Sequence, residues 1–225
     1  MDNNIRKRNM ETIKFLRLNS EFDLDKFLNQ AEKMDKKTLQ GLVRTLRQAN
    51  DDFYEDLYDE GMESDNENWS QKIERDIESI FIELAKIKNA PVHEIAEAII
   101  DGENPYWIYQ FAYQIKNAPT NLLAYALIDI LRRGEIDEEE SAKFMYMFAK
   151  YIEKAPIEDM ARVLLYDIEV VECSASKYLL KFAKLVDGEL KTQLLNRYKE
   201  HEMIMKQERE EHSDIMSDED YQEME

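Results

Sequence analysis

The chain has few of the residues that build loop-rich or cross-linked proteins. Its 225 residues include five glycines, four prolines and one cysteine, Cys173. A β-sandwich or barrel needs many Gly- and Pro-containing turns, so this scarcity favours helices. One cysteine excludes an internal disulfide framework and a cysteine-based zinc cluster. No apolar run approaches the ~20 residues that cross a membrane and no signal peptide opens the chain, so we expect a cytoplasmic protein, in its own cell or a host cell.

The sequence also lacks the patterns of common catalytic and metal-binding sites. It contains no phosphate-binding glycine motif, no H-E-x-x-H and no G-x-S-x-G. Its three histidines are His93, which we expect in solvent, and His201 and His212 in the acidic C-terminal segment. Glu208 lies four residues before His212, but two ligands do not make a metal site. Cys173 lies among apolar residues, which favours an inert buried thiol. We therefore expect no enzyme, no cofactor and no metal.

Charge is abundant and unevenly distributed. The formal net charge is −19, and 35% of the residues are charged. Residues 51–68 hold nine acidic and no basic residues, and residues 199–225 hold eleven acidic and three basic residues. Such runs are typical of solvated loops or tails, and residues 213–225 are expected to be disordered. The alternative is a functional acidic surface that competes with nucleic acid for a basic partner. Its candidate residues are Asp51, Asp52, Glu55, Asp56, Asp59 and Glu60.

A motif around an Ala-Pro pair recurs along the chain. Three copies span residues 84–91, 111–119 and 148–156, and each begins with Leu-Ala or Phe-Ala. A fourth copy, 182–188, ends in a glycine-containing turn instead, and a weaker fifth copy begins at Phe27. After each proline, apolar residues recur at offsets that place them on one face of a helix.

The proline of each copy predicts where one helix ends and the next begins. It disfavours the helical conformation of the residue before it and suits the first turn of a helix. Each copy therefore predicts a first helix that ends at the Ala-Pro pair and a second helix that begins there. One such pair cannot bury its apolar faces alone, so neighbouring pairs are expected to stack. The five expected helix pairs cover residues 24–47, 69–101, 105–132, 141–172 and 175–198.

The pattern predicts an all-α fold, a helical-hairpin repeat array (an α-solenoid) of about five units. The repeat domain covers residues 24–198 and includes the acidic insert 51–68, which is expected to form a loop. Residues 1–23 are expected to form a basic N-terminal capping segment. Residues 199–225 form an acidic C-terminal extension, and its first part, to residue 212, is expected to continue the last helix. The copies resemble HEAT-type helical repeats and short helical repeats of bacterial and phage proteins over about 170 residues. A non-repeating helical bundle is the alternative.

Comparison between copies separates packing positions from added surface residues. Phe111 aligns with a phenylalanine in two other copies, so it is a packing position. Tyr106 aligns with Lys143 and Lys177, and Tyr113 aligns with lysine in the same two copies, which predicts that both tyrosines are exposed. Exposed aromatic residues are enriched at interface hot spots. The alternative is that they pack on the acidic loop or on a neighbouring connector. The candidate partner-binding residues are Tyr106, Tyr113, Tyr109 and Trp107.

Two functions follow from these features. The first is a non-enzymatic binding protein that uses its helical-repeat surface as a scaffold or adaptor for a protein partner. The second is an acidic phage-type inhibitor that mimics the charge of nucleic acid and blocks a host nuclease, CRISPR effector or polymerase. Mimicry predicts binding that weakens steeply with salt, whereas the scaffold depends on its tyrosines. Direct binding to nucleic acid or to a membrane is not expected, and no particular oligomeric state is predicted.

Overall fold

The computed structural model describes residues 23–59, 76–134, 137–166 and 175–222, with side chains for all of these except 51–59 and 208–222. Within these residues the regular elements are α-helices and no strand is present, which confirms the all-α fold class. The chain divides into two compact units, Met1–Pro119 and Thr120–Glu225. The predicted basic segment up to residue 22, the acidic residues 60–68 and Cys173 lie outside the described residues.

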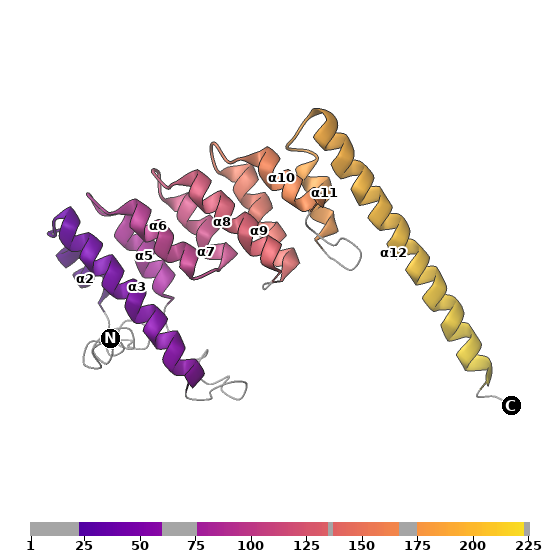
Figure 1. Ribbon diagram of the computed structural model, residues 1–225, viewed down its shortest axis with the longest axis horizontal. Helices are drawn as coiled ribbons and strands as arrows, with labels where there is room; N and C mark the ends of the chain where they lie inside the picture. Colours follow the sequence, from indigo (N-terminus) through magenta and orange to yellow (C-terminus); the bar gives the residue numbers. More distant parts are fainter. Residues whose placement is uncertain (1–22, 60–75, 135–136, 167–174, 223–225) are drawn as a thin grey trace. The chain divides into compact units, whose positions relative to one another are not determined.

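Each unit contains five of the described helices (Figure 1). In unit 1 the helices are α2 (Leu24–Ala31), α3 (Lys36–Asp59), α5 (Ile77–Ala85), α6 (Val92–Asp101) and α7 (Pro105–Gln114). In unit 2 they are α8 (Thr120–Arg133), α9 (Glu138–Tyr151), α10 (Ile157–Tyr166), α11 (Ser176–Phe182) and α12 (Gly188–Gln222). Each expected helix pair corresponds to two successive helices. The boundary between the units falls inside the third pair, so α7 and α8 belong to different units.

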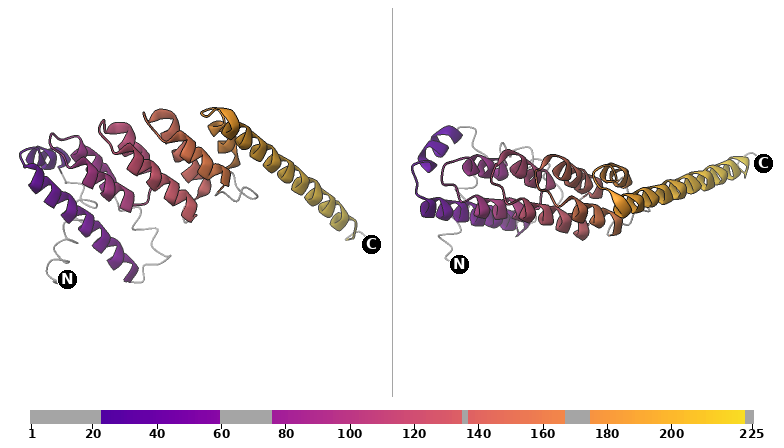
Figure 2. Two further views of the ribbon diagram at one scale, coloured as in Figure 1. Left: turned by 45° about the horizontal axis from the view of Figure 1, so that its top comes forward. Right: turned by 90° about the horizontal axis from the view of Figure 1, so that it is seen from above.

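Within each unit the helices form two layers, because alternate helices in the chain are neighbours in space. In unit 1, α5 packs on both α2 and α7, and α6 packs on α3. In unit 2, α9 packs on α11, and α10 packs on both α8 and α12. Figure 2, in its view from above, shows the rows of helices side by side. The first helices of the pairs therefore lie in one layer of each unit and the second helices in the other.

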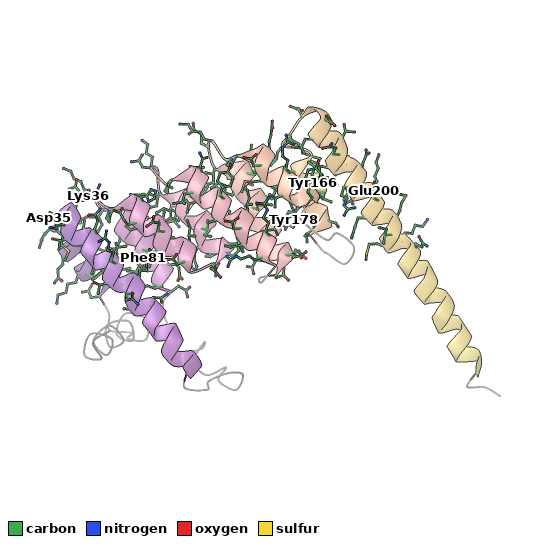
Figure 3. All side chains as sticks on the ribbon, viewed as in Figure 1. Asp35, Lys36, Phe81, Tyr166, Tyr178 and Glu200 are labelled. Atoms are coloured by element: carbon green, nitrogen blue, oxygen red, sulfur yellow. The ribbon has the colours of Figure 1, made fainter. Side chains whose placement is uncertain are left out.

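The residues that recur in sequence form the core between these layers. Phe111, Phe148 and Phe182 are fully buried, as the alignment of copies predicts. Helix α5 is buried on nearly all sides, in agreement with its almost continuous apolar sequence, and its Phe81 lies in the interior of unit 1 (Figure 3). Fully burying such a side chain contributes roughly 1.5–3 kcal/mol, so these positions stabilise each unit.

Short polar side chains begin several of the helices. Asp23 and Asp137 each accept a hydrogen bond from the backbone N–H three residues later, at the starts of α2 and α9. Asp35 does the same for Thr38 in α3, and this bond holds the pKa of the Asp35 carboxyl below its usual value. Asn104 accepts from Tyr106 N–H, and Pro105 follows as the first residue of α7. These are the residue types preferred at helix N-termini, where the first N–H groups lack partners within the helix.

The first helices end earlier than the prolines suggested. Helices α5, α7 and α9 end at Ala85, Gln114 and Tyr151, before the Ala-Pro pair is reached. Ile152 follows α9 in an extended conformation while its N–H still bonds to the Phe148 carbonyl. The chain therefore leaves the helix several residues before the proline, whose main effect is on the start of the second helix.

Both acidic segments contain helix that the sequence did not predict. The prediction of a loop from residue 51 is wrong for residues 51–59, because α3 continues through Asp59. The prediction of disorder from residue 213 is wrong up to Gln222, where α12 ends, while the expected extension of the last helix through 199–212 is confirmed. Adding a residue to an existing helix requires no new nucleus, so a polar segment that follows an amphipathic helix continues it at little cost.

Candidate functional site

The candidate contact surface lies on α7 in unit 1. Tyr106 and Tyr113 are 38% and 62% exposed, which confirms that both stand on the outer face. The Tyr113 ring stacks on the Tyr109 ring, with 5.7 Å between centroids and 27° between planes. The Tyr106 ring meets the Trp107 ring edge-on at 4.8 Å and 70°. Each exposed ring is thus held by a more buried aromatic neighbour on the same helix.

The two supporting residues are less accessible than Tyr106 and Tyr113. Tyr109 is only 5% exposed and Trp107 is half-buried, so Tyr109 offers almost no surface to a partner. Tyr109 lies about one helical turn before Tyr113. Its side chain is on the side of α7 that packs on α5 and α6. The exposed part of the candidate contact surface therefore consists of Tyr106 and Tyr113, and the rings of Trp107 and Tyr109 pack against them.

The equivalent positions in the other copies are also exposed, as the alignment of the copies predicts. Lys143 and Lys150 on α9, Lys177 on α11 and Lys184 in the turn after α11 are all exposed. The fold therefore places no packing demand on these positions, and tyrosine at two of them in α7 is not required for the core. Two large aromatic side chains kept partly in water cost solubility, so their presence favours a contact role.

The acidic surface can be placed only in part. Asp51, Asp52, Glu55, Asp56 and Asp59 lie on the last turns of α3, and their side chains are outside the described part of the chain. Glu60 is also outside it. Their helical backbone spaces these acidic residues regularly, with a rise of about 1.5 Å per residue.

A cleft between α8 and α10 in unit 2 was missed by the sequence reasoning. Its volume is about 320 Å³, and Ile128 and Val163 form its apolar floor. Tyr125 and Tyr166, which are 48% and 66% exposed, stand at its walls, and Figure 3 labels Tyr166 near the end of α10. The remaining lining residues are Arg132, Asp159 and Arg162.

One hydrogen bond joins the two helices that line this cleft. The Tyr125 hydroxyl donates to Asp159 Oδ2 at 2.8 Å, and this bond raises the pKa of the Tyr125 phenol above its usual value. A raised pKa disfavours the phenolate, the form that acts as base or nucleophile. Arg162 Nη2 lies 3.7 Å from Glu158 Oε2 on the surface of α10. Guanidinium and phenol groups beside an apolar floor suit carboxylate and carbonyl groups of a peptide.

The signal for this cleft is present in the sequence but ambiguous. Tyr125, Ile128 and Arg132 follow the i, i+3, i+7 spacing of one helix face, and Asp159, Arg162 and Tyr166 do the same on α10. Only the packing of α10 on α8 brings the two faces together, and that packing depends on residues elsewhere on both helices.

The remaining candidate groups do not form a reactive site among the residues described. His93 is exposed, as expected, with Nδ1 3.5 Å from Glu97 Oε1. His201 on α12 is buried, and its Nε2 has no hydrogen-bond partner within the described part of the chain. Within the described ranges, no three His, Cys, Asp or Glu side chains are grouped so that they could hold a metal ion. None of the described helices combines the length and apolarity needed to cross a bilayer.

Comparison of the chain with protein-family models, with curated proteins and with solved structures gives no match. The likeness to HEAT-type repeats therefore stays an expectation from the spacing of the sequence. The function has to come from the geometry of the chain's own residues.

Proposed function

We propose that this chain is a non-enzymatic scaffold or adaptor that binds a protein partner through a helical-repeat surface. The observation that carries the proposal is the pair of exposed tyrosines on α7, at positions where sister helices carry lysine. Their rings are fixed by aromatic neighbours before any partner arrives, so binding loses little side-chain entropy at them.

The test is capture of partners from cell lysate by the tagged full chain, with identification by mass spectrometry. The variant Tyr106→Ala/Tyr113→Ala should lose the partner, with affinity reduced about 30-fold or more when the purified partner is titrated, because hot-spot tyrosines contribute ~2 kcal/mol or more. Binding through these tyrosines should persist at high salt.

The matched control is Gln110→Ala/Gln114→Ala. It removes two polar side chains from the same helix and leaves both tyrosines in place. A partner that both variants retain, or that only the glutamine variant loses, would contradict the tyrosine contact surface. Circular dichroism of both variants should match the unmodified chain, because the changed tyrosines lie outside the core.

A second candidate function, charge mimicry of nucleic acid, is favoured by the helical backbone of residues 51–59. A helix holds acidic residues at regular spacing, as a phosphate backbone holds its charges. In this case the captured partner would be a nuclease, CRISPR effector or polymerase, released by high salt. A variant in which amides replace the acids at Asp51, Asp52, Glu55, Asp56 and Asp59 would no longer capture this partner. The variant Tyr106→Ala/Tyr113→Ala would still capture it.

A further inference from the structure

Unit 2 carries a positively charged surface on the first helices of its pairs, although the chain as a whole is strongly acidic. Lys181 Nζ on α11 lies 4.1 Å from the centre of the Tyr178 ring and 5.5 Å from that of Tyr146 on α9. Lys150 Nζ lies 4.8 Å from the centre of the Tyr151 ring and 5.8 Å from that of Tyr146. We call this surface the lysine–tyrosine face; it consists of Lys143, Lys150, Lys181, Tyr146 and Tyr151, and the buried Tyr178 ring, only 3% exposed, supports Lys181.

The lysines of this face keep their charge available for a partner. Among the described residues Lys143, Lys150 and Lys181 contact aromatic rings and form no ion pair, whereas the nearby Lys177 pairs with Glu139. A ring holds an ammonium group in place by its quadrupole without neutralising the charge. Tyr151 is 53% exposed and Tyr146 half-buried, so apolar ring surface lies between the charges (Figure 3 shows the position of Tyr178 on α11).

Helix α12 of the same unit carries a surface of opposite character. Its buried side chains, Leu190, Leu194 and His201, lie in its first half, where it packs on α10 and α11. Met203 is 65% exposed and Ile204 is also exposed, yet the helical backbone continues to Gln222. Residues 208–225 carry nine acidic residues and one arginine.

The acidic end of α12 suits a basic partner surface outside its own copy. It continues an existing helix, but like charges spaced along it repel one another, and a basic partner would relieve that repulsion. From residue 207 to 222 the helix extends about 22 Å along its axis, so its end cannot turn back onto α9 and α11 of the same copy without breaking. The required partner surface is basic and partly apolar, to take the acids together with Met203 and Ile204.

We propose that the acidic end of α12 docks on the lysine–tyrosine face of a second copy of this chain. The complementarity is both electrostatic and apolar, because methionine packs well against aromatic rings. Each copy offers both the helix and the face, so a two-fold exchange makes two identical contacts and closes the dimer. This inference goes beyond the proposed scaffold function, since it concerns α9, α11 and α12 and not the tyrosines of α7.

The test is the mass of the full-length protein in solution, measured by sedimentation velocity over a concentration series. The unmodified chain should dimerise at low salt and dissociate as salt is raised. Reversal of the face by Lys143→Glu/Lys150→Glu/Lys181→Glu should weaken dimerisation about 100-fold, because attraction becomes repulsion in both contacts. Reversal of the helix by Glu208→Lys/Glu210→Lys/Glu211→Lys/Asp214→Lys/Asp218→Lys, which leaves four acidic and six basic residues in 208–225, should have the same effect.

The decisive arm mixes these two monomeric variants. In a mixed dimer the reversed face of one variant meets the reversed helix of the other, and the two unmodified surfaces meet each other. Both contacts regain opposite charges, so a heterodimer should form. The control Lys37→Glu/Lys88→Glu/Lys116→Glu changes the same number of exposed lysines in unit 1 and should leave the dimer intact.

Three outcomes would overturn the proposal. The unmodified chain could be monomeric at every concentration, the two variants could fail to restore each other, or the unit 1 control could dissociate the dimer as well. A fluorescent single-stranded oligonucleotide serves as the competing probe. If a monomeric chain bound it and the face variant did not, the lysine–tyrosine face would be a nucleic-acid surface. Circular dichroism of each variant checks that the helices are intact.

Discussion

At the scale of single residues, three of the turns between paired helices repeat a backbone conformation as well as a sequence. Asn89 and Lys154 lie two residues before the proline of their copies, and Gly188 occupies the place of Lys154 in the fourth copy. All three have a positive φ, of 68°, 64° and 66°. Glycine adopts this left-handed region without steric cost and asparagine tolerates it, but lysine does not. The turn therefore imposes strain at Lys154 alone.

This strain gives a prediction for Lys154. The change Lys154→Gly should raise the free energy of unfolding by about 1 kcal/mol, because relief of the left-handed strain exceeds the added flexibility of the unfolded chain. The measurement is urea denaturation followed by circular dichroism.

The control for Lys154 is its neighbour in the same turn. Glu153 is outside the set of positive-φ residues, so Glu153→Gly should lower the free energy of unfolding by roughly 0.5–1 kcal/mol. Equal effects of the two changes, whatever their sign, would show that the left-handed conformation is not the cause.

Comparison between copies predicted burial well where three copies agree. Phe111 and its two equivalents are fully buried, and the tyrosines that replace lysine are exposed. It says less about how deeply Tyr109 is buried, because Tyr109 is 5% exposed while its equivalents Tyr146 and Leu180 are half-buried. The exposure of a side chain at such a boundary position depends on the neighbouring helices of each unit. The periodicity of a single helix contains no information on those neighbours.

At the scale of the helices, polar pairs join neighbouring second helices. Gln40 Nε2 on α3 donates to Glu94 Oε1 on α6, and Arg47 pairs with Asp101 in the same two helices. In unit 2, Tyr125 on α8 donates to Asp159 on α10. Glu94 and Asp159 both lie three residues after the proline of their copies. An acid at this position thus joins α6 to α3 in unit 1 and α10 to α8 in unit 2.

The hydrogen bond between Gln40 on α3 and Glu94 on α6 predicts that the free energy of unfolding depends on pH. A hydrogen bond from its own backbone N–H and a second from Gln40 hold the pKa of Glu94 below its usual value. A lowered folded-state pKa stabilises the protein above the usual pKa of 4.5, and this contribution is lost as the pH falls through the folded-state value. The change Glu94→Gln should therefore destabilise at neutral pH, by less than about 1 kcal/mol, and have no effect at strongly acidic pH.

The measurement is the difference in free energy of unfolding between the unmodified and Glu94→Gln chains over a pH series. Repeating it in a Gln40→Ala background removes the donor on α3, so the difference at neutral pH should shrink. A difference that stays constant down to strongly acidic pH would contradict the role of the charged carboxylate.

The helices that the sequence missed share one cause. The apolar periodicity of α3 becomes weak in the acidic segment, which predicted a loop from residue 51, and the acidic end of the chain predicted disorder from residue 213. Periodicity reports burial, whereas helix continuation depends on backbone bonds that exposed residues also make. The cleft between α8 and α10 was missed because it needs two helices that lie far apart in sequence to meet.

At the scale of the whole molecule, the division into two units was not visible in the repeat pattern. The pattern is continuous through residue 119, where α7 and α8 were expected to form one pair, yet the boundary falls between them. A repeat chain is held together by contacts between neighbours, so its cooperativity depends on how strong each neighbouring contact is. Two compact units, each with its own buried phenylalanines, predict two regions that unfold separately.

Phe111 and Phe148 test this division, because they occupy the same position in their copies and are both fully buried, one in each unit. Either phenylalanine changed to alanine should cost about 3–5 kcal/mol in the unit that contains it. Hydrogen exchange read by mass spectrometry reports each unit separately. Phe111→Ala should speed exchange in α5, α6 and α7 and leave α9, α10 and α11 protected, and Phe148→Ala should do the reverse. If both changes speed exchange in all of these helices to the same degree, the two units unfold as one.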